Sequence, residues 1–348
     1  MRRNIYDLSK LELEEFCVNN GFKKFRSKQI WQWLYANGVN DFEDMKNISC
    51  SFRSLLQEYF LIKHLKIRKC LKSNDGTIKW IFLLEDSKEI ETVYIPEGNR
   101  GTVCISSQVG CTLSCSFCHT GTMKLERNLN LFEIIGQVLL VKNEINDWSK
   151  KTEDRKVTNI VFMGMGEPLF NYDNVIKSIN ILSDEEGMAI SKRKITLSTS
   201  GVVPRIVDFK YEKDVNLAIS LHAVFDRKRN VLVPINKKWP LSKLITVLKE
   251  YNSYRDKKRI TFEYIMLKDV NDTIEDAKEL IKLIGDLKSK VNLIPFNKWP
   301  GSKYEVSPND RIEEFQKYII QKGNILATIR KPRGEDILAA CGQLKSLQ

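Results

Sequence analysis

Strand-like and helix-like segments alternate from about Gly101 to residue 330, and this alternation narrows the possible folds of the 348-residue chain. Short segments rich in β-branched residues predict buried strands, and longer segments with apolar residues every three or four positions predict helices. Such alternation favours a parallel sheet covered by helices, either doubly wound or rolled into a barrel, with ligands at the carboxyl ends of the strands. We expect strands at Thr102–Ser106, Asn159–Met163, Lys194–Ser198, Asn216–Leu221, Ile260–Met266, Val291–Pro295 and Ile325–Ile329, and helices at Leu131–Glu144, Leu241–Tyr251, Ile274–Leu287 and Asn309–Lys322.

The first hundred residues have a different pattern. Three segments with helical spacing come first, and three segments with alternating apolar residues, separated by turn sequences, follow them. We expect the helices at Ser9–Asn19, Ser27–Ala36 and Ser51–Phe60, and the strands at Lys66–Leu71, Thr77–Leu84 and Ile90–Ile95. The predicted division is a helical N-terminal domain (1–62), a β connection (63–100), an α/β core (101–330) and a C-terminal segment (331–348).

The charge balance bears on partners rather than on the fold. Lys and Arg number 56 against 44 Asp and Glu, a net charge of +12, which favours a polyanion such as nucleic acid; a basic surface without a partner is the plain alternative. The runs Arg227–Arg229, Lys237–Lys238 and Lys257–Arg259 either hold phosphates or form ordinary solvated faces. No apolar stretch approaches the roughly 20 residues that cross a bilayer, and no secretion signal follows Met1. We expect a cytoplasmic protein without membrane contact.

Three of the eight cysteines, Cys111, Cys115 and Cys118, are spaced C-x3-C-x2-C just after a predicted strand. In a chain without an export signal, this clustering indicates metal or redox chemistry rather than disulfides. Three thiolates can bind three corners of a cubane iron–sulfur cluster and leave the fourth iron open to another ligand. A zinc site completed by His119, or buried inert thiols, are the alternatives.

A second feature is the turn that ends the strand predicted at Asn159–Met163. It carries Gly164, Gly166 and Glu167. Glycines let a backbone approach a ligand closely, and a carboxylate there can bind the ammonium group of an amino acid. An ordinary turn between a strand and a helix would have the same composition.

The cysteine spacing, with the aromatic Phe117 before the last cysteine, resembles the radical S-adenosylmethionine (SAM) superfamily. In that superfamily SAM chelates the open iron of a [4Fe–4S] cluster, and its one-electron cleavage gives a 5′-deoxyadenosyl radical. The resemblance implies a partial (β/α) barrel with Cys111, Cys115 and Cys118 as cluster ligands. By the same resemblance the SAM contacts are Gly166, Glu167, Ser198, Ser220, Leu221, His222 and Asn297.

The C-terminal segment makes the resemblance more specific. Cys341 lies in Ala-Ala-Cys-Gly-Gln-Leu, which resembles the tail of the RlmN/Cfr family of RNA methyltransferases; by itself, a cysteine between alanines is more typical of a packed core. The resemblance covers most of the chain. It includes the segments Phe25–Ile30, Glu91–Pro96, Cys104–Cys111 and Ile195–Gly201.

The family resemblance implies methylation of carbon 2 of an adenosine in 23S rRNA and of the adenosine next to the anticodon in tRNA. Two SAM molecules are used in each turnover. Cys341 takes a methyl group from the first, and the radical from the second removes a hydrogen atom from that methyl group. The carbon radical adds to adenine and links the enzyme to the RNA. Glu91 then removes the adenine proton, and Cys104 releases the product by forming a disulfide with Cys341.

The implied partners are RNA, whose target adenosine must leave its stack, and an electron donor for the cluster; we expect a monomer. Cys17, Cys50 and Cys70 have no role in this scheme and are expected to pack in the core. Two alternatives stay open. One is Cfr-type methylation at carbon 8, and the other is a non-catalytic, zinc-dependent RNA-binding protein, which leaves Glu91, Cys104 and Cys341 without a role.

Overall fold

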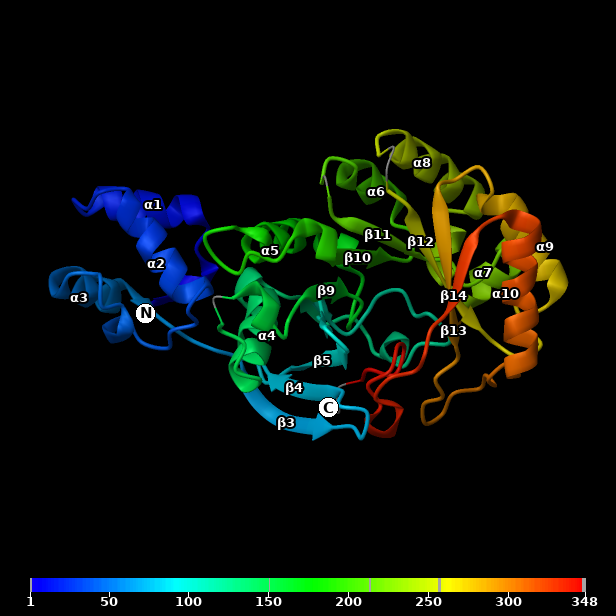
Figure 1. The fold of residues 1–348 in the computed structure, drawn as a ribbon, viewed down its shortest axis with the longest axis horizontal. Coiled ribbons are helices and arrows are strands. Elements are labelled where there is room, and N and C mark those ends of the chain that lie inside the picture. Colours follow the sequence, from blue (N-terminus) through cyan, green and yellow to red (C-terminus); the bar gives the residue numbers. More distant parts are fainter. Residues whose placement is uncertain (1, 150, 213, 256–257, 346–348) are drawn as a thin grey trace.

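The computed structural model describes residues 2–149, 151–212, 214–255 and 258–345. Figure 1 shows three N-terminal helices at one end of the molecule and a large twisted sheet with its covering helices at the other. No helix within these ranges is long and apolar enough to cross a membrane. The helices are α1 (Lys10–Asn19), α2 (Phe25–Tyr35), α3 (Cys50–Tyr59), α4 (Leu131–Glu144), α5 (Tyr172–Ser183), α6 (Val203–Phe209), α7 (Asp226–Leu232), α8 (Leu241–Ser253), α9 (Ile274–Ile284) and α10 (Asn309–Gly323).

The main sheet is 10-stranded, in the order β14-β13-β12-β11-β10-β9-β6-β5-β4-β3. Its strands are β3 (Lys66–Lys72), β4 (Ile78–Leu83), β5 (Glu89–Glu97), β6 (Arg100–Cys104), β9 (Asn159–Phe162), β10 (Ile195–Thr199), β11 (Asn216–Ser220), β12 (Ile260–Met266), β13 (Ser289–Pro295) and β14 (Leu326–Ile329). From β6 to β14 neighbouring strands are parallel and follow one another in chain order. A doubly wound sheet reverses its strand order at a switch point, so the structure decides between the two predicted architectures in favour of a partial barrel.

The antiparallel strands β3, β4 and β5 extend the sheet beyond β6. They correspond to the three strands predicted between Lys66 and Ile95. Figure 1 shows the C-terminal segment beside these strands. Asp336 accepts hydrogen bonds from Ser73 and Asn74 in the turn between β3 and β4, so the end of the chain is held against the antiparallel part of the sheet.

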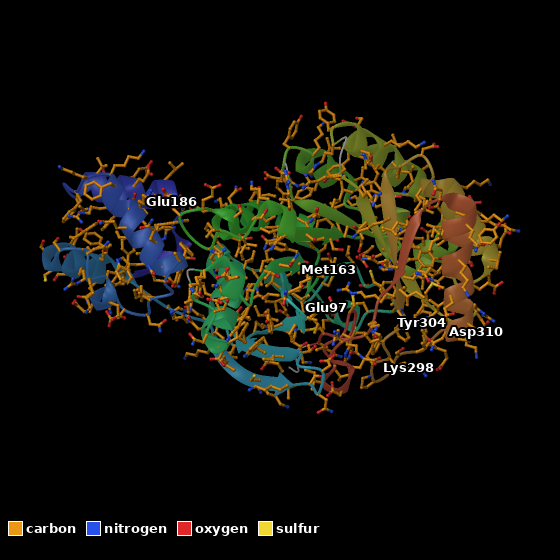
Figure 2. The ribbon with its side chains drawn as sticks, viewed as in Figure 1. Glu97, Met163, Glu186, Lys298, Tyr304 and Asp310 are labelled. Carbon is orange, nitrogen blue, oxygen red and sulfur yellow. The ribbon has the colours of Figure 1, made fainter. Side chains whose placement is uncertain are left out.

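The N-terminal helices pack on the core through aromatic residues. The two short parallel strands β1 (Arg3–Asn4) and β2 (Phe60–Leu61) join both ends of this region. Tyr6 is fully buried and stacks on Phe132 of α4, with ring centroids 6.2 Å apart. Glu186, labelled in Figure 2, follows α5 and forms ion pairs with Lys10 and Lys28 of the N-terminal helices.

The prediction that Cys17, Cys50 and Cys70 pack in the core is correct only for Cys17. That residue is fully buried in α1, whereas Cys50 and Cys70 are exposed. Cys50 opens α3 on its solvent side, and Cys70 lies on the edge strand β3, where most residues are exposed.

Candidate active site

The loop that carries Cys111, Cys115 and Cys118 is closed at its base by a short antiparallel pair, β7 (Gln108–Val109) and β8 (Arg127–Asn128). The three cysteines line one cavity of about 130 Å³, which we call the cysteine cavity. The other predicted site residues on its wall are Gly166, Glu167, Ser198, Ser220, His222 and Cys341. The fold thus brings together residues that are up to 230 positions apart in the sequence.

Burial controls the chemistry of the three thiols. Desolvation raises the pKa of Cys111 to about 12 and also raises the pKa values of Cys115 and Cys118. Ligation of thiolates therefore needs a strongly positive partner such as a metal centre. Within the described residues, no three Cys, His, Asp or Glu side chains are gathered closely enough for one metal ion. A cubane cluster instead takes each thiolate on a different iron, and three cysteines that line one cavity supply that donor set.

The turn after β9 is shaped by glycines. Gly166 has φ +94°, and a Cβ at this position would lie 2.5 Å from Cβ of Gln108, so only glycine fits. The next residue, Glu167, is buried, and its two carboxylate oxygens accept hydrogen bonds from the backbone N–H groups of Ser200 (2.9 Å) and Leu169 (3.1 Å). Desolvation nevertheless raises the pKa of Glu167 to about 7.

Two further strand ends contribute polar groups to the cysteine cavity. Ser198 of β10 and Ser220 of β11 lie with their hydroxyl oxygens 3.4 Å apart. His222 has φ +60°, and its Nδ1 accepts a hydrogen bond from the backbone N–H of Ile265 at 3.1 Å. Burial lowers the pKa of His222 to about 3, so the imidazole is neutral and carries its proton on Nε2.

Leu221 and Asn297 lie differently from the other predicted SAM contacts. Leu221 is fully buried. Its backbone N–H donates to the Glu263 carbonyl, and its own carbonyl accepts from the Arg229 guanidinium. Asn297 lines a second cavity and donates a hydrogen bond from Nδ2 to the carbonyl of Cys341 at 3.1 Å. The structure therefore places neither residue on the wall of the cysteine cavity.

The run Arg227–Arg229 does not face solvent as a whole, which corrects its interpretation as one continuous basic surface. Lys228 forms an ion pair with Asp276, and Arg229 is fully buried. The Arg229 guanidinium donates to backbone carbonyls at the ends of β10 and β11. These carbonyls belong to Ser200 (2.7 Å), Ser220 (3.2 Å) and Leu221 (3.0 Å). Of the other runs, Lys237 and Lys238 are exposed, and Lys257 lies outside the described residues.

Cys341 is held in place by hydrogen bonds on both sides of it. The backbone N–H of His119 donates to the Gly342 carbonyl at 2.7 Å, and Lys79 donates to the Leu338 carbonyl at 3.0 Å. The residue is exposed, and it lines both cavities. Desolvation raises the pKa of Cys341, and the positive charge of Arg330 opposes that rise.

Glu91 and Cys104 face the C-terminal segment from β5 and β6. One Glu91 carboxylate oxygen lies 3.4 Å from Nζ of Lys79, and the other accepts from the Lys345 backbone N–H at 3.2 Å. Cys104 is buried, and desolvation raises the pKa of its thiol to about 12, with a further contribution from Cys341.

The second cavity, of about 520 Å³, lies inside the barrel next to the C-terminal segment. We call it the polar cavity because charged side chains make up much of its wall. Figure 2 labels two of its lining residues, Met163 after β9 and Glu97 at the end of β5, near the middle of the molecule. The polar cavity and the cysteine cavity share Met163, Glu263, Ile294 and Cys341.

Two buried charged residues of this region were missed by sequence reasoning. Arg229 was grouped with a basic run, and Glu263 lies inside a strand that is otherwise mostly apolar. A carboxylate inside a strand predicted to be buried is itself unusual, and this signal could have identified Glu263. For Arg229, the partners are backbone carbonyls, which leave no trace in the sequence.

Comparisons with known proteins agree with this geometry. Residues 3–62 match the family described as "Ribosomal RNA large subunit methyltransferase N-terminal domain". Residues 105–284 match the radical SAM superfamily.

Similar proteins span nearly the whole chain. A protein of Rhodopseudomonas palustris named "Dual-specificity RNA methyltransferase RlmN" is 51% identical over 99% of this chain and 90% of its own length. A relative of the same name from Rhizobium meliloti is 52% identical over 98% of this chain and 86% of its own. The crystal structure of a radical SAM methyltransferase from Sphaerobacter thermophilus is 40% identical and superimposes with a TM-score of 0.91, covering 98% of both chains.

Proposed function

Because the chain belongs to the RlmN family of dual-specificity RNA methyltransferases, within the radical SAM superfamily, we propose that it methylates carbon 2 of adenosine in 23S rRNA and in tRNA next to the anticodon. The observation that carries this proposal is the position of Cys341. Its thiol lies where the cysteine cavity meets the polar cavity. A methyl group on this sulfur can therefore face a cofactor on one side and a substrate base on the other.

The cysteine cavity supports binding of a [4Fe–4S] cluster and SAM. Cys111, Cys115 and Cys118 supply the three thiolates, and the glycine turn at Gly166 leaves space for a ligand beside Glu167. The Glu167 carboxylate is placed to bind the SAM ammonium group, and the Ser198 and Ser220 hydroxyls supply further hydrogen bonds. When bound, the cluster and SAM supply the radical chemistry that an electron-poor, non-acidic C–H bond requires.

Cys341 would accept a methyl group as a thiolate, the nucleophilic form of cysteine. Arg330 favours that form, because its positive charge lowers the pKa of Cys341 against the effect of desolvation. The methyl donor is one SAM, and a second SAM serves the radical step, so each turnover uses two.

Glu91 would remove the proton from carbon 2 of the covalent adduct. Desolvation raises the pKa of Glu91, which makes its carboxylate a stronger base, and the charge of Lys79 opposes that rise. Its hydrogen bond from the Lys345 backbone N–H ties it to the segment that carries Cys341.

Cys104 would release the product. Attack of the Cys104 thiolate on the Cys341 sulfur would break the bond between sulfur and the transferred carbon and form a Cys104–Cys341 disulfide. The released carbon would take up a proton to become the methyl group on adenine, and the unpaired electron of the adduct would pass to a one-electron acceptor such as the oxidised cluster. An external dithiol must then reduce this disulfide by two electrons. The two residues lie on adjacent parts of the fold, Cys104 at the end of β6 and Cys341 in the C-terminal segment.

The proposal extends to the organisation of the protein. Residues 1–62 would contact RNA, 63–100 would connect the two parts, 101–330 would form the radical SAM core and 331–348 would carry the methyl-accepting cysteine. We also propose a cytoplasmic monomer that takes electrons for its cluster from an external electron donor.

The test is nucleoside mass spectrometry of rRNA and tRNA from a host that lacks such an enzyme, with and without this chain. We expect 2-methyladenosine in both RNA pools only when the chain is present. Its absence from one pool would remove the dual specificity. Formation of 8-methyladenosine would replace the carbon-2 assignment by Cfr-type chemistry at carbon 8, and an unmodified pool with an intact cluster would refute the substrate assignment.

A further inference from the structure

A row of polar side chains crosses the inner wall of the barrel. Glu263 of β12, Asn292 of β13 and Thr328 of β14 are in register on adjacent strands. Thr328 donates to Oδ1 of Asn292 at 2.8 Å, and Nδ2 of Asn292 donates to Oε1 of Glu263 at 3.0 Å. The row ends at Oε2 of Glu263, which is buried and has no hydrogen-bond partner within the described part of the chain.

An unpaired, buried carboxylate oxygen is costly, because its lost hydration is not replaced. Glu263 is only 4% exposed, and it lines both cavities. The remaining lone pairs of Oε2 therefore point to a ligand with an N–H or O–H donor.

Arg330, directly after β14, faces the same space. Its Nη1 lies 3.9 Å from Oε2 of Glu263, which is an ion-pair distance but too long for a hydrogen bond. Within the described residues, the Arg330 guanidinium donates no hydrogen bond. Cys341, Arg330 and Glu263 all line the polar cavity. The polar cavity thus presents a thiol, a hydrogen-bond donor and an acceptor.

Adenine carries the complementary groups on the edge that begins at carbon 2. Carbon 2 is followed on the ring by N1, an acceptor, and then by the amino group on N6, a donor. Guanine has the reverse pattern, with a donor at N1 and an acceptor at O6. With carbon 2 toward the thiol, a guanidinium at N1 and a carboxylate at N6 would favour adenine over guanine on this edge.

We propose that Glu263 and Arg330 read the edge of the target adenine, with Oε2 of Glu263 accepting from N6 and the Arg330 guanidinium donating to N1. This assignment rests on the proposed function. It places carbon 2, which adjoins N1, toward Cys341, and it makes Glu263 and Arg330 the residues that determine base specificity.

The adenosine of SAM is a second source of the same chemistry. The lining residues favour the RNA base. Arg330 lines the polar cavity and not the cysteine cavity, where the cluster ligands and the predicted SAM contacts Ser198 and Ser220 lie. A ligand that contacts both Glu263 and Arg330 must therefore occupy the polar cavity.

The experiment compares methylation of two RNAs that differ only at the target: one carries adenosine and the other purine riboside, which lacks the N6 amino group. For the reconstituted wild-type enzyme we expect kcat/KM to favour adenosine by about 10-fold to 100-fold, the usual range for a hydrogen bond to a charged group. In Glu263→Ala the ratio of the two kcat/KM values should fall close to one. Equilibrium binding of the same two RNAs gives the ratio for any variant whose turnover is slow.

The matched control is Glu133→Gln. Glu133 has the same 6% side-chain exposure as Glu263, and its arginine partner, Arg127, is 34% exposed against 36% for Arg330. It lies on α4, away from both cavities, so its variant should keep the full preference. Glu263→Gln, which preserves side-chain volume, guards against a folding defect in Glu263→Ala.

The outcomes separate the proposals. If both folded Glu263 variants keep the wild-type preference for adenosine over purine riboside, the proposal that Glu263 binds the N6 amino group is overturned. Loss of RNA-independent SAM binding or cleavage in those variants would assign Glu263 to SAM instead and also overturn it. Failure of the wild-type enzyme to methylate the adenosine RNA would refute the proposed function itself. A further RNA with 1-deazaadenosine, which lacks N1, should lose activity with wild type and show no additional loss with Arg330→Met.

Discussion

The cysteine cavity and the polar cavity share a wall but satisfy their polar groups differently. In the cysteine cavity, Glu167 has both carboxylate oxygens bonded to backbone N–H groups. In the polar cavity, Oε2 of Glu263 and Oδ1 of Asn297 are buried without partners within the described residues. Cys341 borders both cavities.

This difference indicates two kinds of ligand. A group that is bound throughout the catalytic cycle is best held by a preorganised site, in which backbone geometry fixes each side chain before binding. A substrate that enters and leaves must instead offset the cost of its own desolvation. Unpaired groups in the free protein increase the binding free energy, because the substrate supplies their missing hydrogen bonds. The first description fits the cysteine cavity and the second fits the polar cavity.

The largest effect is expected for Cys341→Ala, which removes the only thiol shared by both cavities among the described residues. RNA methylation should fall to background, because no other thiol among the described residues borders the polar cavity. Iron content and reductive cleavage of SAM should be retained, since Cys111, Cys115 and Cys118 are untouched. Mass spectrometry of RNA nucleosides and iron analysis of the purified variant measure both.

The control for that variant is Cys70→Ala, a change at an exposed thiol on the edge strand β3. It should methylate RNA as the wild type does. Methylation that persists in Cys341→Ala would contradict the central place of this thiol, and loss of SAM cleavage would mean that the two cavities are not separable.

The next effect concerns the support of the cysteine cavity. Arg229→Met leaves the carbonyls of Ser200, Ser220 and Leu221 without their buried donor. Because each unpaired buried carbonyl is costly, we expect the free energy of unfolding to fall by about 4 kcal/mol. Affinity for SAM should fall as well, since these carbonyls belong to the strand ends that carry Ser198, Ser220 and His222.

Urea denaturation and equilibrium SAM binding test that prediction. The control is Arg205→Met, whose exposed ion pair with Asp208 is worth at most about 1 kcal/mol. Equal stability of the two arginine variants would show that Arg229 does not hold the strand ends.

Sequence reasoning predicted the cysteine cavity better than the polar cavity, and the reason is physical. Strand ends and short motifs are local, so Glu167, Ser198 and the three cysteines could be placed at one edge of the barrel from their patterns alone. β12 is found at its predicted bounds, Ile260–Met266. The choice between a barrel and a doubly wound sheet needed the strand order.

The polar cavity depends on contacts between distant segments. Glu263 meets Arg330 only because β12, β13 and β14 are neighbours, and Cys341 meets both only because the C-terminal segment folds back across the sheet. Arg229 was misread for a similar reason, since three adjacent basic residues look alike in a sequence although one points inward. Cys50 and Cys70 show the converse, apolar thiols left at the surface by their places on α3 and β3.

A smaller effect, which depends on pH, comes from Glu167. Burial raises its pKa from 4.5 to about 7, so the folded protein binds this proton more tightly than the unfolded chain does. Its contribution therefore favours folding less and less as the pH rises from about 4.5 to 7, by about 3 kcal/mol at most. Urea denaturation without SAM should show this decline, and Glu167→Gln should flatten it. An identical pH slope in the two proteins would refute the raised pKa.

The smallest effect on stability is expected for Asn297→Ala in the polar cavity. The variant loses the 3.1 Å hydrogen bond from Nδ2 to the Cys341 carbonyl, but it also removes the unpaired Oδ1. Because these terms have opposite signs, the free energy of unfolding should stay within about 1 kcal/mol of wild type. Methylation should nevertheless decrease, since the backbone of Cys341 loses a restraint. Denaturation and methylation rates measured on the same preparation separate these effects. A loss of stability as large as that of Arg229→Met would mean that Oδ1 is already paired, and the contrast between the two cavities would then not hold at this residue.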